Sequence, residues 1–191
     1  MDSDQLEQYL QNAIFPDLDK GRPDWDKPHT QAVVHYLKQI FSNTPDLTVD
    51  QTVLLIAAYA HDWGYSEIYH NGQRLQPKDA HMQISAQKIS SLLNDSFFAF
   101  LNSSQKQQII DLVLYHDDYS HKTQPEEILL LEADTLGALS VKFVKPDFTP
   151  EKNAIWMTGA LEKRYPLFLT PYSKSEFQVL FKQRKEYYSK I

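Results

Sequence analysis

Apolar side chains recur every three to four residues along most of this chain, which is the spacing of one face of an α-helix. The segment that starts at His29 shows the pattern well, because Val33, Tyr36 and Ile40 follow on the same face. Alternation typical of a β-strand is not convincing anywhere. The pattern therefore predicts helices at residues 3–14, 27–41, 50–61, 79–93, 103–116, 125–143, 149–164 and 173–189, with a short one at 97–100.

Prolines and glycines lie between these segments and mark the connections. Residues 15–28 read as turns, residues 63–78 as an irregular loop, and residues 117–124 as a polar loop. Asp79 is expected to cap the helix that follows it. The length of 191 residues suits one domain, residues 1–191, and the pattern predicts an all-α, irregular helical bundle.

The composition excludes several classes of function. The chain has no cysteine, which excludes disulfides, thiolate metal sites and cysteine nucleophiles. The acidic N-terminus does not resemble a signal peptide, and no apolar run reaches membrane-spanning length, so we expect a cytoplasmic protein without a membrane partner. The net charge of −6 argues against a nucleic-acid polymer as partner. A small anionic substrate remains compatible if local cations or a metal hold it.

Polar residues also occur on faces that are otherwise apolar. The apolar run at residues 53–60 ends in His61 and Asp62, just before Gly64. A buried pair of this kind needs a partner, because burying polar or charged groups unpaired costs several kcal/mol. One such residue alone would be a satisfied core histidine. The whole set from five segments points to one shared metal site of nitrogen and oxygen ligands, and it consists of His29, His61, Asp62, His81, His116 and Asp134.

These residues resemble the H…HD…D signature of the HD-domain superfamily. Residues 60–64, AHDWG, are similar to the family's usual AHDIG, and residues 132–138, EADTLGA, are similar to its DADxLxA. His81 and His116 resemble the two additional histidines of the binuclear branch. The resemblance covers residues 25–145, on which we expect the N- and C-terminal helices to pack.

The resemblance implies an all-helical fold that binds one or two divalent ions of manganese, iron, zinc, nickel or cobalt. His29, His61, Asp62 and Asp134 would hold the first ion. His81 and His116 would hold the second, and Asp62 would bridge the two. Most members of the family hydrolyse phosphate esters, whereas a minority, including myo-inositol oxygenase, use a di-iron pair to oxidise their substrate.

The chain departs from the family pattern beside the motif. Tyr65 follows Gly64 where a phosphate-binding lysine often stands, and Glu67 is more simply a solvated residue than a catalytic substitute. Lys88 lies seven residues after His81 on the same helical face, so it is a candidate phosphate ligand, with a snorkelling surface lysine as the alternative.

Three further residues lie in the loops that we expect to frame the pocket. Arg74 and Lys78 could form a substrate lid, although an exposed charged loop is the simpler interpretation. Asp117 could orient the preceding His116 or act as a base, or it could be a solvated acid at a helix end.

The sequence therefore predicts a metal-dependent phosphohydrolase that acts on a nucleotide or small phosphorylated metabolite, with His61, Asp62 and Lys88 as its catalytic residues. A di-iron oxygenase with the same ligands is the main alternative. A non-catalytic domain with a structural metal, and an all-α interaction protein without metal, also remain open. The oligomeric state is not indicated.

Overall fold

The computed structural model describes residues 2–22, 24–146 and 148–190, apart from the side chain of His121. The all-α prediction is confirmed. The main helices are α1 (Ser3–Leu18), α2 (Asp26–Asn43), α3 (Gln51–Ala60), α5 (His81–Leu92), α6 (Ser103–Leu114), α7 (Pro125–Leu139), α8 (Pro150–Gly159) and α9 (Pro171–Tyr188). Within the described ranges, no helix is long and apolar enough to cross a lipid bilayer.

Capping residues set where several of these helices begin. Asp50 accepts hydrogen bonds from the backbone N–H groups of Thr52 and Val53 at the start of α3. Asn102 and Gln105 form a capping box at the start of α6. Each cap satisfies backbone donors that the first turn of a helix leaves free, so the sequence defines these starts locally.

The predicted irregular loop at residues 63–78 contains more regular structure than the sequence indicated. It forms α4 (Tyr65–Ile68) and a hairpin of β1 (Tyr69–His70) and β2 (Gln73–Arg74). Asn71 and Gly72 make the hairpin turn with positive φ angles of 48° and 78°, which asparagine and glycine tolerate best. Strands of two residues are too short for any alternation to reveal them.

Other short elements complete the chain. The 3₁₀ turns are η1 (Lys78–Ala80), η2 (Ser96–Phe98), η3 (Tyr119–His121) and η5 (Tyr165–Leu167), and η4 (Ala160–Arg164) is a π turn that continues α8. Helix α1 runs through Pro16 and ends at Leu18 instead of ending before the proline. Asp79 does not cap α5, since η1 leads directly into that helix.

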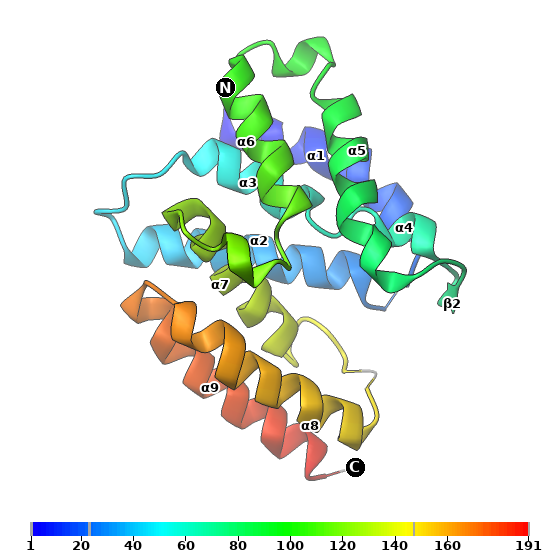
Figure 1. Ribbon diagram of the computed structural model, residues 1–191, viewed down its shortest axis with the longest axis vertical. Helices are drawn as coiled ribbons and strands as arrows, with labels where there is room; N and C mark the ends of the chain where they lie inside the picture. The colour runs from blue at the N-terminus through cyan, green and yellow to red at the C-terminus, as the bar shows by residue number, and fades with distance from the viewer. Residues whose placement is uncertain (1, 23, 147, 191) are drawn as a thin grey trace.

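Helix α2 crosses the middle of the molecule and packs most extensively against α7 (Figure 1). Helices α1, α3, α5 and α6 lie on one side of this pair, and α8 and α9 lie on the other. Both central helices contribute to two apolar clusters, because Val33 and Leu129 belong to the larger one while Tyr36 and Leu136 belong to the one beneath α9. The α2–α7 pair is therefore the structural centre, and it carries two of the predicted metal ligands.

Gly137 permits the close approach of these two helices. A Cβ atom at this position would lie 2.9 Å from Val33 Cγ2 and 3.0 Å from the Val33 backbone nitrogen. Because backbone atoms of a packed helix cannot easily move, we expect Gly137→Ala to lower the free energy of unfolding by about 1–3 kcal/mol. The measurement is chemical denaturation. Gly159→Ala is the matched control, since nothing lies within 4 Å of its added Cβ, and it should leave stability unchanged or raise it by up to about 1 kcal/mol.

Candidate metal centre

The structure brings the six predicted ligand residues together from five segments. His29 lies on α2 and Asp134 on α7, whereas His61 and Asp62 directly follow α3. His81 is the first residue of α5, and His116 comes two residues after α6 ends. All six are buried, with at most 7% of each residue exposed.

A glycine allows the turn after α3 to reach α5. A Cβ atom on Gly64 would collide with the His81 carbonyl oxygen and would lie 2.9 Å from the Ser85 backbone nitrogen. The Gly64 N–H donates to Ser85 Oγ over 2.7 Å, which fixes this approach. The glycine of the HD motif thus sets His81 beside Asp62, and any other residue at position 64 would separate the two segments.

The six side chains form two compact groups of three, as their ligand atoms show. His29, His61 and Asp134 make one group, and Asp62, His81 and His116 make the other. Within each group, one ligand atom per residue lies within 4.8 Å of the other two.

Asp62 joins these groups through its two carboxylate oxygens. Its Oδ2 lies 3.6 Å from Nε2 of both His29 and His61. Its Oδ1 lies 3.3 Å from His116 Nε2 and 3.6 Å from His81 Nε2. One oxygen therefore faces each group, which is the orientation that a bridging carboxylate requires.

Backbone carbonyls orient three of the four histidines. Nδ1 of His61, His81 and His116 each lies 2.8 Å from the carbonyl oxygen of the residue three positions earlier. A carbonyl can only accept a hydrogen bond, so each Nδ1 carries a proton, and Nε2 of each ring faces into the site, where the neutral form of the ring offers its lone pair. Metal-binding histidines are usually held in this way.

These orientations leave lone pairs facing each other at close range. The Nε2 atoms of His81 and His116 are 3.2 Å apart, and those of His29 and His61 are 3.4 Å apart. Two neutral acceptors at that separation repel each other unless a cation lies between them or one ring is protonated. The residues present therefore fit divalent metal ions, and the mixture of imidazole and carboxylate donors suits zinc, iron, manganese, nickel or cobalt.

Burial and neighbouring charges shift the pKa values of the residues in the cluster. Burial lowers the pKa values of His61 and His81. Burial also opposes the charge on His116, but the carboxylates of Asp62 and Asp117 outweigh it and raise the pKa of His116 to about 9. The surrounding histidines outweigh burial at Asp62 and hold its pKa well below the usual range. The site thus keeps its carboxylates ionised and attracts positive charge.

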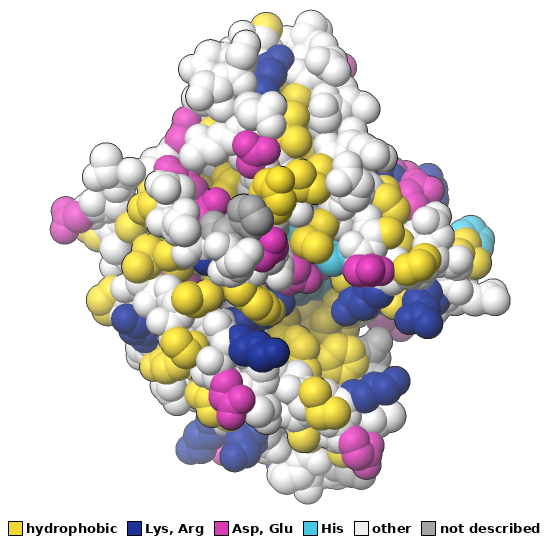
Figure 2. Space-filling view, viewed as in Figure 1, with side chains coloured by type: hydrophobic (Ala, Val, Ile, Leu, Met, Phe, Trp, Pro, Cys, Tyr) yellow, Lys and Arg dark blue, Asp and Glu magenta, His cyan; other side chains and the backbone are white. Residues whose placement is uncertain are grey.

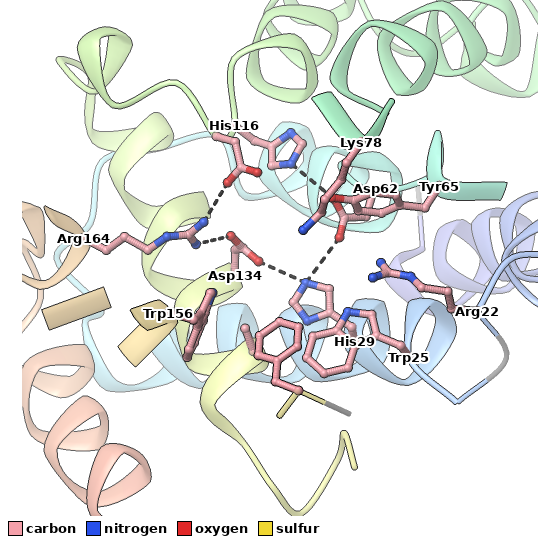
Figure 3. A pocket seen from close by; sticks show the side chains of 13 residues that line it. Arg22, Trp25, His29, Asp62, Tyr65, Lys78, His116, Asp134, Trp156 and Arg164 are labelled. Atoms are coloured by element: carbon pink, nitrogen blue, oxygen red, sulfur yellow. Dashed lines mark hydrogen bonds and ion pairs between the residues drawn. The ribbon is translucent and has the colours of Figure 1, made fainter. Parts of the chain in front are cut away.

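A cavity of about 80 Å³ opens beside the cluster. Figure 3 shows Arg22, Lys78 and Arg164 pointing toward it from three sides, with His29, Asp62 and Asp134 at its inner end. Aromatic side chains form much of the remaining wall, and these are Trp25, Tyr65, Phe148 and Trp156. The arrangement offers an anion both the candidate metal positions and positively charged side chains.

Arg164 contacts two acidic residues of the site, although no sequence motif indicated it. Its Nη1 donates to Asp134 Oδ2 over 2.6 Å, and its Nη2 donates to Asp117 Oδ1 over 2.7 Å. The free oxygen of each carboxylate faces a histidine, since Asp134 Oδ1 is 3.0 Å from His29 Nε2 and Asp117 Oδ2 is 3.6 Å from His81 Nε2. Arg164 therefore orients two acids toward the cluster.

Arg164 lies on the π turn that follows α8, outside every motif that the sequence displayed. The only available signal was its place eight residues after Trp156 on a predicted helix, and that spacing alone does not distinguish it from a surface arginine. The burial of Arg164 and its bonds to Asp117 and Asp134 depend on how the π turn η4 packs against α7, which the sequence did not indicate.

Lys88 is not brought to the site, which corrects the expectation that it contacts substrate. Its Nζ donates to Ser66 Oγ over 2.9 Å and forms salt bridges with Asp17 and Glu67 over 2.8 and 3.0 Å. It also lies over the Trp63 ring. Lys88 does share a helical face with His81, but it lies almost two turns further along the axis of α5, about 10 Å away, and its side chain extends toward α1 and α4 instead of the cavity.

The remaining candidates are also placed. Glu67 pairs with Lys88 and is exposed, so the solvated interpretation holds for it. Arg74 lies on β2 and does not line the cavity, whereas Lys78 does. The ring of Tyr65 stacks on His81 with centroids 4.4 Å apart, and the pKa of Tyr65 is raised by burial. Tyr65 therefore supports a candidate ligand.

The two groups predict separable metal sites. Protein purified without chelator should contain close to two divalent ions per chain, and His81→Ala should retain close to one, because His81 belongs to only one group. Elemental analysis of both proteins measures this. His70→Ala, at an exposed hairpin position, is the control and should match the unaltered protein. Equal metal content in His81→Ala and the unaltered protein would contradict the assignment.

Arg164 should tune metal affinity through the carboxylates that it orients. We expect Arg164→Ala to weaken metal binding by about 10–100-fold, since partners of ligand residues contribute on this scale. Competition with a chromogenic chelator measures the affinity. Arg164→Lys should recover only part of the loss, because an ammonium cannot hold two carboxylates with the fixed fork of a guanidinium. The exposed neighbour Lys163→Ala is the control, and an equal loss there would contradict the role.

Comparison with known proteins now gives the family. No curated protein and no solved structure matches the chain. The family model of the HD domain matches residues 28–139, which is more than half of the 191 residues and contains all six residues of the cluster. The motif, the helical fold and this match agree, and the chain belongs to the HD-domain family.

Proposed function

We propose that this protein is a metal-dependent phosphohydrolase that cleaves a phosphate ester of a nucleotide or small phosphorylated metabolite. The observation that carries the proposal is the position of Asp62, whose two oxygens each face a separate group of ligand atoms. Six buried polar residues in this arrangement are costly for a fold unless they bind cations. Most known members of the HD superfamily hydrolyse phosphate esters, which supports the proposal by analogy.

The charges around the cavity favour an anionic substrate. Arg22, Lys78 and Arg164 line it together with Asp62, Asp117 and Asp134, so these charges balance until divalent ions bind and make the lining positive, in a protein whose net charge is −6. Local positive charge of this kind concentrates anions where the average field would repel them. A phosphate group is the ligand that both guanidinium and ammonium groups bind well.

Two divalent ions bound to the cluster would supply an acidified water and charge stabilisation at the phosphoryl group. The chain's own residues divide the remaining work. Lys78 and Arg22 are in place to bind phosphate oxygens, and Arg164 keeps Asp117 and Asp134 turned inward. Asp117 Oδ2 lies 3.6 Å from His81 Nε2 and is the oxygen of this carboxylate that Arg164 does not bind, so it can accept a proton from a water at the site.

Tyr65 explains how this chain manages without a lysine after Gly64. The guanidinium of Arg22 lies 4.4 Å from the centre of the Tyr65 ring, and the Lys78 ammonium lies 5.7 Å from it. Aromatic faces attract cations in this way. Tyr65 thus holds two positively charged side chains beside the cavity, and they take over the phosphate contact that we had assigned to Lys88.

The direct test combines metal analysis with a phosphate-release screen across nucleotides and sugar phosphates. Manganese, zinc, nickel or cobalt together with phosphate release would support hydrolysis. Near two equivalents of iron, oxygen consumption and no phosphate release would instead support the oxygenase alternative. A tightly bound metal with neither activity would support a structural role for the metal.

Lys78 should contribute to substrate binding. We expect Lys78→Ala to raise KM for a released phosphate ester by about tenfold with a smaller effect on kcat, because a contact made equally in ground and transition states changes KM alone. Steady-state phosphate release measures both constants. Arg74→Ala is the matched control from the same segment, since Arg74 is exposed and does not line the cavity. Equal KM values for Lys78→Ala and the unaltered enzyme would contradict the contact.

A further inference from the structure

A second, larger cavity continues outward from the candidate metal centre. It measures about 570 Å³ and shares Arg22, Trp25, Lys78 and Phe148 with the inner cavity. The shared residues form the neck between the two spaces. Figure 2 shows a hollow in this face of the molecule, with hydrophobic side chains inside it, a histidine at its edge and both Lys or Arg and Asp or Glu side chains around it.

The lining of the outer cavity is strongly basic. Lys145 and Lys152 join Arg22 and Lys78, whereas Asp24 is the acid among the described lining residues. The formal charge of these side chains is therefore four positive against one negative, in a chain whose net charge is −6. Because the net charge of the protein is negative, an average part of its surface would be acidic. The positive charge gathered at this cavity therefore indicates that it binds an anion.

The lysines are also available to a ligand. Lys78, Lys145 and Lys152 are exposed, and none of them forms a salt bridge with any residue that the structure describes. Arg22 differs, because its guanidinium is held by Asp26 at 2.9 Å from Nε. Lys145 and Lys152 line the outer cavity but not the inner one, so they lie beyond the neck as seen from the metal centre.

Two of the four residues in the neck between the inner and outer cavities are aromatic. Trp25 and Phe148 stack with ring centroids 5.7 Å apart, and Trp25 also stacks on His29. Rings of this kind pack against the flat face of a sugar or base. The order along the path is therefore metal cluster, aromatic neck and lysine pair.

We propose that the outer cavity binds a second phosphate group, so that the substrate is a ring-containing bisphosphate with one phosphate at the metal centre and the other at Lys145 and Lys152. This substrate class rests on the proposed function, which accounts for the inner phosphate. The outer lysines determine specificity and take no part in bond cleavage. They select bisphosphates over monophosphates because each unpaired ammonium gains a charged partner only when the second phosphate is present.

The test compares matched pairs of probes on the metal-loaded protein. Adenosine 3′,5′-bisphosphate is compared with adenosine 5′-monophosphate, and fructose 1,6-bisphosphate with fructose 6-phosphate. Dissociation constants come from titration calorimetry, and where a probe is hydrolysed the ratio of kcat/KM replaces the ratio of affinities. We expect at least one bisphosphate to be preferred by tenfold or more, with a preference that weakens as salt is raised. A preference below threefold for both pairs would overturn the proposal.

A double variant tests whether the lysines cause the preference. Lys145→Ala with Lys152→Ala should reduce the tenfold preference to less than threefold. The control removes the same charge elsewhere, through Lys174→Ala with Lys185→Ala on exposed positions of α9, and it should keep the preference. A preference that survives the first pair of changes, or that the control abolishes equally, would overturn the assignment to this cavity.

The result also separates this proposal from the proposed function. Bisphosphate preference without phosphate release from any probe would support the outer cavity and contradict hydrolysis. Phosphate release with equal treatment of bisphosphates and monophosphates would support hydrolysis and contradict the outer cavity.

Discussion

The Asp62 carboxylate is the group on which the rest of the site depends. It is buried between four imidazole rings, with one oxygen turned to His29 and His61 and the other to His81 and His116. A negative charge in such a place is tolerated only when positive charge surrounds it. The helices that deliver these rings must therefore meet at one point, which ties the arrangement of α2, α3, α5 and α6 to the chemistry of a single side chain.

A second electrostatic relation links the C-terminal part of the chain to this centre. Asp134 and Asp117 share the guanidinium of Arg164, which comes from the π turn after α8. Burial alone would raise the pKa of Asp134, but Arg164 and His29 outweigh it and keep the pKa far below its ordinary value. The family match ends at residue 139, so this arginine reaches the site from outside the matched region.

The cations around the cavity come from segments other than the one that carries the HD motif. The chain has Tyr65 in place of a lysine, and that ring supports Arg22 and Lys78 from two different segments. The lysine that helical spacing favoured, Lys88, instead stabilises the contact between α1, α4 and α5 through Asp17. Spacing along a helix identifies a face, but the direction in which a long side chain extends depends on which partners the neighbouring helices provide.

The sequence by itself determined the all-α class, most helix positions and the six buried His and Asp residues, because periodic apolar faces and short motifs are local properties of the chain. The division of those residues into two groups followed from the family resemblance and not from the residues themselves, since it depends on how five segments converge in space. The sequence could not place Arg164, Lys78 or the aromatic neck around the cavity, because Arg164 depends on the packing of η4 against α7, and Lys78 on the packing of η1 against α4 and α5. Motifs consist of residues close together in the sequence, whereas charge balance and cavity shape arise only from tertiary contacts.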